Sequence, residues 1–350
     1  MIKKKIFIER FKFLFKEVTL FFFFIFGFIT LIWFIISLLF EKNSIFFSLL
    51  FYGLRILAVF FSILLVLMIS NKLYKNECFY KDKSYQYSIL SSQLRFFKIT
   101  KKNMKYQILY SILLFEFIIV PIDFIICFLN PSFLIFSAIH FILVPQYIFI
   151  FFNNILFFIT FLIIIQLFNA VFLETICKGF LIGRGSKKFN SISAVFIASW
   201  FYSIQNFKFF LEPISTFISV WNLIILFIES FILGIILGGF FSRKKWLIPI
   251  ILIQTIRNFI YGFISWGYFN HLDIYQLIII IYLPLLISGI ILFILQFNRV
   301  KESISLGLKM FRAYIKYKDL IRINKFDKIF IIICDFIAGF IISIFSILIL

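Results

Sequence analysis

Long uncharged apolar runs recur along the chain, and they constrain its fold more than any other feature. The first run covers residues 19–40, which are 22 consecutive positions without a charged side chain. A membrane-spanning helix needs about 20 apolar residues, so this run is long enough to cross a bilayer. It is too long for the core of a cleaved signal peptide, and no small-residue cleavage site follows it. We therefore expect an uncleaved transmembrane helix.

The composition of the 350-residue chain agrees with a membrane protein. Hydrophobic residues make up 63% of it and charged residues only 14%, whereas a soluble domain has about 25% charged residues. Further apolar runs of spanning length occupy residues 46–69, 107–129, 190–210, 216–241, 246–269, 274–297 and 329–350. The expected fold class is all-α, a polytopic bundle of membrane helices.

The positions of the basic residues predict the topology. Of the 35 Lys and Arg residues, 31 lie in five segments between or beside the spans, at residues 1–16, 71–106, 178–188, 243–245 and 299–328. Cytoplasmic loops carry such an excess of Lys and Arg, so we expect these segments and the N-terminus in the cytoplasm. The net charge of +20 then belongs to loops at the inner (cytoplasmic) membrane. The expected partner is the lipid bilayer, and nucleic acid is not expected.

One apolar stretch, residues 133–173, is too long for one crossing and barely long enough for two. All five basic segments face the cytoplasm only if this stretch makes one net crossing, which gives about nine crossings in all. Residues 133–152 would then be re-entrant, tilted or buried against other helices. The alternative, two full crossings, places the later basic segments outside.

The segments group into four regions. Residues 1–130 hold a cytoplasmic lead-in and three spans, residues 131–297 a transmembrane core, and residues 329–350 a last span. Between them, residues 298–328 alternate basic and apolar side chains, as in Lys309-Met310-Phe311-Arg312. This alternation is typical of a helix on an anionic membrane surface, and it is also compatible with a solvated basic linker.

Charged side chains inside apolar spans are costly, so each is a candidate for a function or a partner. We expect structural ion pairs between neighbouring spans, namely Arg55 with Glu116 or Asp123, and Glu229 with Arg257. Asp335 is expected to face the interior of the bundle.

One group of polar residues forms an ordered series of motifs. Residues 174–181 read ETICKGFL, Phe201 and Gln205 follow on the next span, a glycine-rich helix contains Gly234 and Gly238, and Gln254 and Asn258 lie on a fourth span. This series resembles the CPBP (Abi) family of intramembrane proteins, which includes the type II CAAX prenyl endopeptidases. That family shows EExxxRGxL, then FxxxH, a glycine-rich helix, and HxxxN or HxxxD. The resemblance covers roughly residues 155–297.

The resemblance implies a site in which a Glu activates water and the histidines and Asn complete a metal centre within the bilayer. A peptide would be cut near its prenylated or membrane-embedded end. In this chain, Glu174 and Thr175 stand at the positions of the Glu pair, and Lys178 stands at the position of the Arg. Gln205, Gln254 and Asn258 stand at the positions of the remaining site residues. Phe201 and the residues Thr175 and Lys178 would support the site.

The departures from the family bear directly on catalysis. Both family histidines are Gln here, and the two histidines of the chain, His140 and His271, are expected near the outer face. Zinc prefers imidazole, thiolate and carboxylate ligands, so we expect no cofactor unless the protein is an active peptidase that holds zinc.

Three functions follow as hypotheses. The first is a catalytically degenerate relative that binds a membrane-anchored or prenylated peptide or protein, in immunity or envelope maintenance. The second is an active intramembrane metallo-endopeptidase. The third is a transporter-like or structural membrane protein unrelated to that family.

Overall fold

The computed structural model describes residues 2–42, 44–73, 101–131, 134, 154–188, 190–204, 220–316 and 325–349, and its elements within these ranges are helices. Some consecutive elements follow each other without a break and form one long helix. The elements in chain order are α1 (Ile2–Phe13), η1 (Leu14–Val18), α2 (Thr19–Leu39), α3 (Ile45–Leu73), α5 (Lys101–Leu114), η3 (Phe115–Ile119), α6 (Val120–Leu129), α8 (Ile155–Glu174), η5 (Thr175–Ile182), α9 (Gly183–Lys188), α10 (Ser191–Ile204), α11 (Val220–Lys244), α12 (Ile248–Phe269), α13 (Ile274–Leu295), α14 (Phe297–Lys316) and α15 (Lys325–Ile349).

The helices confirm the all-α polytopic fold. Seven of them, among the described residues, are long and apolar enough to cross a membrane, and two shorter apolar helices lie at Ser191–Ile204 and Ile329–Phe345. These nine helices lie at the positions of the nine expected crossings, and seven of them have spanning length within the described residues. Large apolar side chains face outward; Leu38, for example, is 71% exposed and Phe23 is 69% exposed. In water such a surface would be unfavourable, but in a bilayer it contacts lipid chains.

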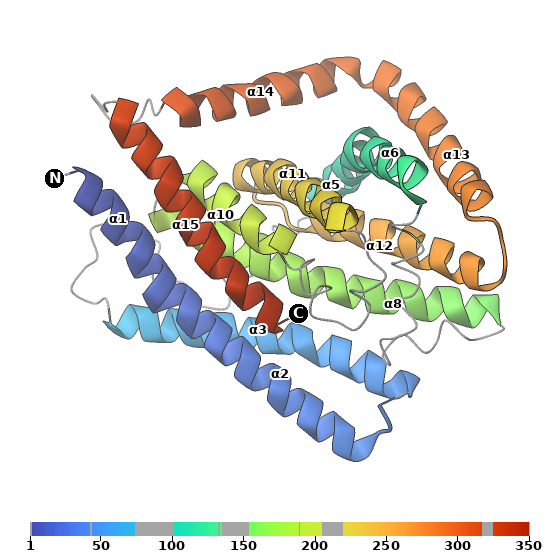
Figure 1. Ribbon diagram of the computed structural model, residues 1–350, viewed down its shortest axis with the longest axis horizontal. Coiled ribbons are helices and arrows are strands. Elements are labelled where there is room, and N and C mark those ends of the chain that lie inside the picture. The colour runs from blue at the N-terminus through green and yellow to red at the C-terminus, as the bar shows by residue number, and fades with distance from the viewer. Residues whose placement is uncertain are drawn as a thin grey trace.

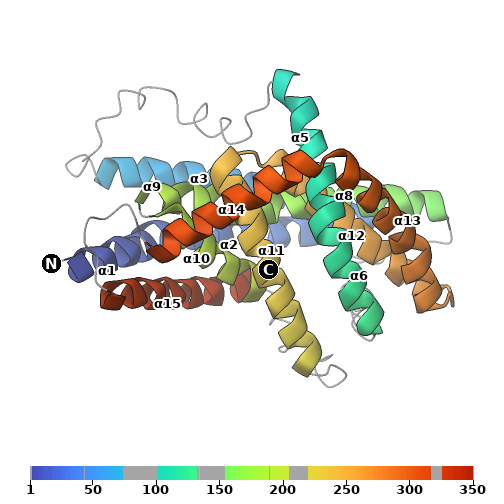
Figure 2. The same ribbon diagram turned by 90° about the horizontal axis from the view of Figure 1, so that it is seen from above.

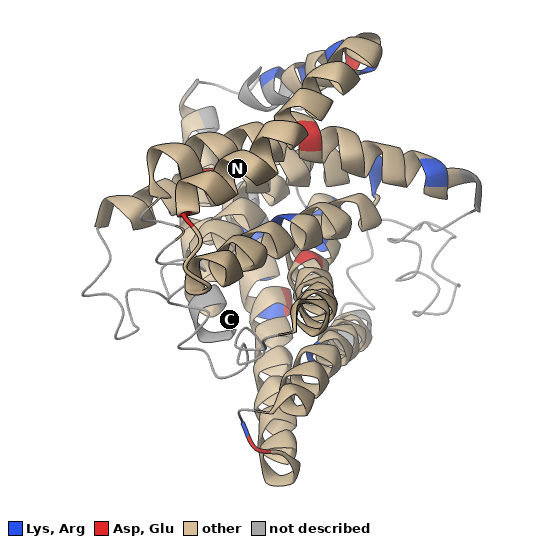
Figure 3. Cartoon of the chain, turned by 90° about the vertical axis from the view of Figure 1, so that its right-hand side faces the viewer, with Lys and Arg blue, Asp and Glu red and all other residues tan. Residues whose placement is uncertain are grey.

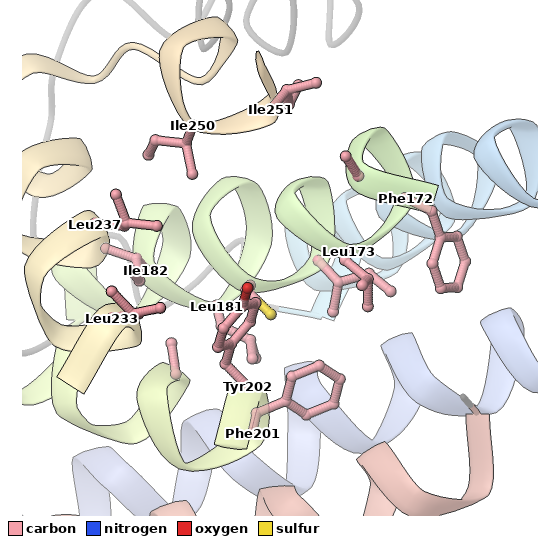
Figure 4. Packing of buried hydrophobic residues seen from close by; sticks show 14 of the residues in the cluster. Phe172, Leu173, Leu181, Ile182, Phe201, Tyr202, Leu233, Leu237, Ile250 and Ile251 are labelled. Atoms are coloured by element: carbon pink, nitrogen blue, oxygen red, sulfur yellow. The ribbon is translucent and has the colours of Figure 1, made fainter. Parts of the chain in front are cut away.

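The helices surround a central helix, α10 (Figures 1 and 2). Helix α10 packs against α11, α15 and η5, while α2 packs on α3 and α12 packs on α8. Figure 4 shows the packing at this centre, where Phe201 and Tyr202 of α10 lie beside Leu181 and Leu173. The same hydrophobic core includes Phe21 of α2, so residues on both sides of the expected division at residue 130 share it.

Contacts between helix ends show which of these ends lie on the same face of the bundle. On one face, Glu17 pairs with Arg184 and Lys188, and Lys245 donates a hydrogen bond to Ser186. On the other face, Asn130 at the end of α6 donates a hydrogen bond to Asn222 at the start of α11. We call the first the basic face.

This arrangement bears on the ambiguous stretch, residues 133–173. The long helix Ile155–Lys188 ends at the basic face, so it begins at the opposite face, where α6 ends. One net crossing between α6 and α9 accounts for that geometry. Most of residues 133–152, as well as His140, lies outside the described residues, so the path of that segment stays a prediction.

Each π-helical segment in the described part of the chain carries or adjoins a buried glutamate. Glu17 lies in η1, Glu116 lies in η3, and Glu174 immediately precedes η5. All three glutamates are less than a tenth exposed. Single π-helical turns inside α-helices occur frequently at functional sites, which directs attention to these positions.

Candidate functional site

The candidate site begins with an ion pair buried at the end of α8. The Nζ atom of Lys178 lies 2.8 Å from Oε2 of Glu174, four positions earlier, and the two side chains are 1% and 0% exposed. Residues four apart on a helix share a face, and this pair keeps that relation although Lys178 lies in η5. A buried charge is costly without a partner, so each of these groups compensates the other.

Tyr202 of α10 connects this ion pair to the next helix. The Lys178 ammonium lies 4.1 Å from the centre of the Tyr202 ring, within the range of a cation–π interaction. The Tyr202 hydroxyl donates a 2.7 Å hydrogen bond to Oε1 of Gln254 on α12. Tyr202 therefore joins η5, α10 and α12 at one point.

The amides of α12 complete the chain of contacts. Nε2 of Gln254 donates a 3.1 Å hydrogen bond to Oδ1 of Asn258, as expected for residues one turn apart. The structure thus brings together Glu174, Gln254 and Asn258, three of the four predicted site residues. Gln205, the fourth, lies outside the described residues.

The supporting residues have different environments. Thr175 is buried next to Glu174, and Lys178 holds the ion pair described above. Phe201 is fully buried, and its ring stacks on Phe22 of α2 with the ring centres 5.3 Å apart. Phe201 therefore packs α10 against α2, which is a structural role.

Sequence reasoning missed Tyr202 as a site residue. Its signal lay in the motif itself, because Tyr202 directly follows Phe201 and carries a hydroxyl group within the span. A buried Tyr hydroxyl usually finds a hydrogen-bond partner, so a Tyr at that position is a candidate contact for a polar residue on a neighbouring span.

Counting positions in the first motif corrects one assignment. EExxxR places its Arg five positions after the first Glu and four after the second, whereas Lys178 is four positions after Glu174. With Lys178 at the Arg position, Glu174 occupies the place of the second Glu. Leu173 then stands where the resemblance implies the water-activating Glu.

The donor atoms at this site do not fit zinc. The described set offers one carboxylate, already paired with Lys178, and two amides whose oxygens accept hydrogen bonds from Tyr202 and Gln254. Structural and catalytic zinc sites use imidazole, thiolate and carboxylate ligands. Elsewhere in the described part of the chain, no group of three His, Cys, Asp or Glu is placed to hold a metal ion.

A second buried polar cluster adjoins the first along α12. The Arg257 guanidinium donates Nε hydrogen bonds of 3.1 and 3.0 Å to the two oxygens of Asp123 on α6, and its Nη2 binds Glu229 on α11 and the hydroxyl of Tyr261. The expected pairing of Glu229 with Arg257 is confirmed. Asp123, one of the partners considered for Arg55, binds the same guanidinium. Tyr202 interacts electrostatically with both Glu174 and Arg257, so the two clusters are close in space.

Arg55 is buried by aromatic rings. Its guanidinium lies 4.0 Å from the centre of the Phe172 ring, and Phe51 and Tyr52 are also within cation–π range. Phe172 lies two residues before Glu174, so Arg55 fixes α3 beside the end of α8.

The glycine-rich helix packs closely on α10. A Cβ atom at Gly234 would lie 3.0 Å from Ser199, and one at Gly238 would lie 3.0 Å from both Ile182 and Val195. The absence of side chains there lets α11 approach α10 and η5. The glycines of the motif therefore bring α10 and η5, which carry Tyr202 and Lys178, close to α11.

Comparisons with known protein families, characterised proteins and solved structures found no match to this chain.

Proposed function

We propose that this multi-pass membrane protein is a non-catalytic relative of the CPBP family that binds a membrane-anchored or prenylated peptide. One observation carries the non-catalytic part. Glu174 is buried and paired with Lys178, and the neighbouring polar atoms are joined through Tyr202, Gln254 and Asn258. A general base must reach the proton that it abstracts, whereas this carboxylate is already engaged by a cation within the protein.

In this proposal, the buried polar groups around Tyr202 stabilise the helix bundle. Three elements, η5, α10 and α12, are linked by the cation–π contact of Lys178 with Tyr202 and by the hydrogen bond from Tyr202 to Gln254. Polar contacts between membrane helices stabilise a bundle because the unpaired groups would otherwise remain in hydrocarbon. A degenerate site can therefore persist as the polar link at the centre of the bundle. The peptide partner rests on the resemblance alone.

We infer further that the basic face is cytoplasmic, which places the protein in the inner membrane with its N-terminus inside. The contacts of Glu17 with Arg184 and Lys188, and of Lys245 with Ser186, support this inference because they bring three of the five basic segments, 1–16, 178–188 and 243–245, to one side of the bundle. Positive charge in short loops is retained in the cytoplasm.

The experiment compares binding, cleavage and metal content in one preparation. Purified protein in liposomes is exposed to a farnesylated peptide carrying a photo-crosslinker and to the same peptide without the farnesyl group. We expect crosslinking of the farnesylated form only, no cleavage, and no stoichiometric zinc by mass spectrometry. Stoichiometric zinc that disappears in Glu174→Ala, together with cleavage, would establish the active peptidase instead.

Two further outcomes are informative. Equal crosslinking of the two peptides would remove the peptide-binding proposal and favour a transporter-like or structural role. The double variant Gln205→His, Gln254→His restores the two imidazoles, and we expect it to bind zinc more tightly than wild type if both positions face one pocket. Cleavage is not expected to return, because Leu173 and Lys178 still differ from the family pattern.

A further inference from the structure

Helix α14 lies along one edge of the bundle and contacts α13 and α10 (Figure 1). Its sequence places Arg299, Lys301, Lys309, Arg312 and Lys316 among apolar residues, with Glu302 as its one acidic residue. Figure 3 shows basic positions in blue along the helix at the top of the molecule. Apolar residues of the same helix are also uncovered, since Ile304 is 57% exposed and Leu308 is 53% exposed.

Two cavities open along this helix. The first, of about 390 Å³, lies between α14, α13 and the rod formed by α5, η3 and α6. Its walls are mainly apolar, with Leu113, Phe117, Leu286 and Phe293 among the lining residues. A cavity with such walls suits a hydrocarbon chain.

The second cavity, of about 500 Å³, adds positive charge. Three cations line it, Lys301, Lys309 and Arg312, together with Phe297 and Leu308. Phe293, Val300 and Ile304 line both cavities, so the two cavities adjoin along α14. Apolar walls thus pass directly into a cluster of cations.

The polar residues of the first cavity indicate where an anion would lie. Arg299 lines this cavity beside α14, whereas the carboxylate of Glu116 packs against Gly289 of α13. An anionic group is attracted to Arg299 and the lysines and repelled by Glu116. It would therefore lie at the α14 side of the cavity.

The cavities lie towards the basic face. Tyr110 of α5 lines the first cavity, and the Lys244 ammonium lies 5.2 Å from the centre of that ring. Lys244 is adjacent to Lys245, whose contact with Ser186 defines the basic face. Juxtamembrane basic clusters attract anionic lipids of the cytoplasmic leaflet, by about 1 kcal/mol per basic residue.

We propose that the α13–α14 corner is a binding site for one anionic glycerophospholipid, with its headgroup attracted by the α14 cations Arg299, Lys301, Lys309 and Arg312 and an acyl chain in the apolar cavity. The apolar walls distinguish this site from one for a soluble phosphate. The four cations distinguish it from a site for a zwitterionic lipid, which carries no net charge. This proposal is independent of the function proposed for the Glu174 cluster.

The test measures which lipid stays bound. Protein is reconstituted in nanodiscs of phosphatidylcholine mixed with phosphatidylglycerol, extracted in mild detergent, and analysed by native mass spectrometry. We expect retained phosphatidylglycerol to exceed phosphatidylcholine, and the excess to fall about thirtyfold in Arg299→Gln, Lys309→Gln. The control Lys105→Gln, Arg243→Gln removes two exposed cations that line neither cavity, and it should keep the excess.

A second pair of variants tests the acyl-chain cavity. Ile290 lines the first cavity, whereas the neighbouring Ile291 lines neither, and both are more than half exposed. We expect Ile290→Trp to reduce the number of retained lipids and Ile291→Trp to leave it unchanged. The proposal is overturned if wild type shows no preference for phosphatidylglycerol, or if the paired variants behave alike in either comparison.

Discussion

The Arg10 guanidinium binds the carboxylate of Asp335, which lies 325 positions later in the chain. Both side chains are buried, at 2% and 0% exposed, and Arg10 also donates a 3.1 Å hydrogen bond to Ser193 of α10. This contact joins the first helix, the central helix and the last helix. It confirms that Asp335 faces the interior, and it places Arg10 inside the protein as well.

Asp335→Ala should strongly destabilise the bundle, because it leaves the buried Arg10 charge without its carboxylate. Breaking a buried ion pair on one side typically costs about 3–5 kcal/mol. We expect a clearly lower midpoint of thermal unfolding in detergent, followed by size-exclusion chromatography or tryptophan fluorescence. The exposed acid Glu302, changed to Ala, serves as the control and should unfold like wild type.

The double variant Arg10→Met, Asp335→Leu separates the loss of a partner from the loss of the pair. Replacement of a buried ion pair by apolar residues of similar size is often neutral or stabilising. We expect it to recover most of the midpoint lost in Asp335→Ala. A double variant no more stable than the single one would mean that the ion pair itself, with its bond to Ser193, holds the helices together.

Close packing between α11 and α10 gives a prediction with a control on the same helix. Gly234→Val places a side chain against Ser199, including its Cα at 3.1 Å, whereas a Cβ at Gly239 meets nothing within 4 Å. Overpacking of this kind costs about 1–3 kcal/mol. We expect a lower unfolding midpoint for Gly234→Val and little change for Gly239→Val. Equal midpoints would show that α11 can move away from α10 without cost.

Helix boundaries could be predicted from sequence because a run of apolar residues is a local property. The first run, residues 19–40, corresponds to α2, Thr19–Leu39, and the run at 246–269 corresponds to α12, Ile248–Phe269. Contacts within one helix followed equally from spacing. Gln254 meets Asn258, and Glu174 meets Lys178, because residues four apart share a face.

Contacts between distant helices did not follow from spacing. Residues 1–16 are predicted as a cytoplasmic lead-in from their charges, yet Arg10 is buried, as is Glu17 just beyond that segment. Their partners lie 167 or more positions away, and nothing local in the sequence specifies them. For the same reason the choice of Asp123 for Arg257, and the link through Tyr202, required the three-dimensional arrangement of the helices.

The stability of the buried cluster of Asp123, Glu229 and Arg257 depends on the charge of Arg257. Arg257→Gln leaves Asp123 and Glu229 as two carboxylates around a neutral amide, and like charges in a low-dielectric interior repel. We expect a loss of about 3–5 kcal/mol in stability, as for other broken buried pairs. Arg243→Gln removes an exposed arginine and should leave the unfolding midpoint unchanged. Adding Asp123→Asn and Glu229→Gln to Arg257→Gln should restore part of the midpoint, whereas no recovery would argue against repulsion as the cause.

The cytoplasmic placement of the basic segments can be tested through a native thiol. Cys78 lies in residues 71–106, a segment with nine basic residues that falls mostly outside the described residues. The other three cysteines, Cys127, Cys177 and Cys334, are buried, so a membrane-impermeant maleimide should react with Cys78 before them. We expect no labelling in intact cells and labelling after permeabilisation, because the positive charge keeps this segment inside. Cys78→Ser should abolish the signal in permeabilised cells, which verifies that the label reports this residue. Labelling of intact cells that is lost in Cys78→Ser would reverse the orientation, and it would also place the proposed lipid site on the outer leaflet.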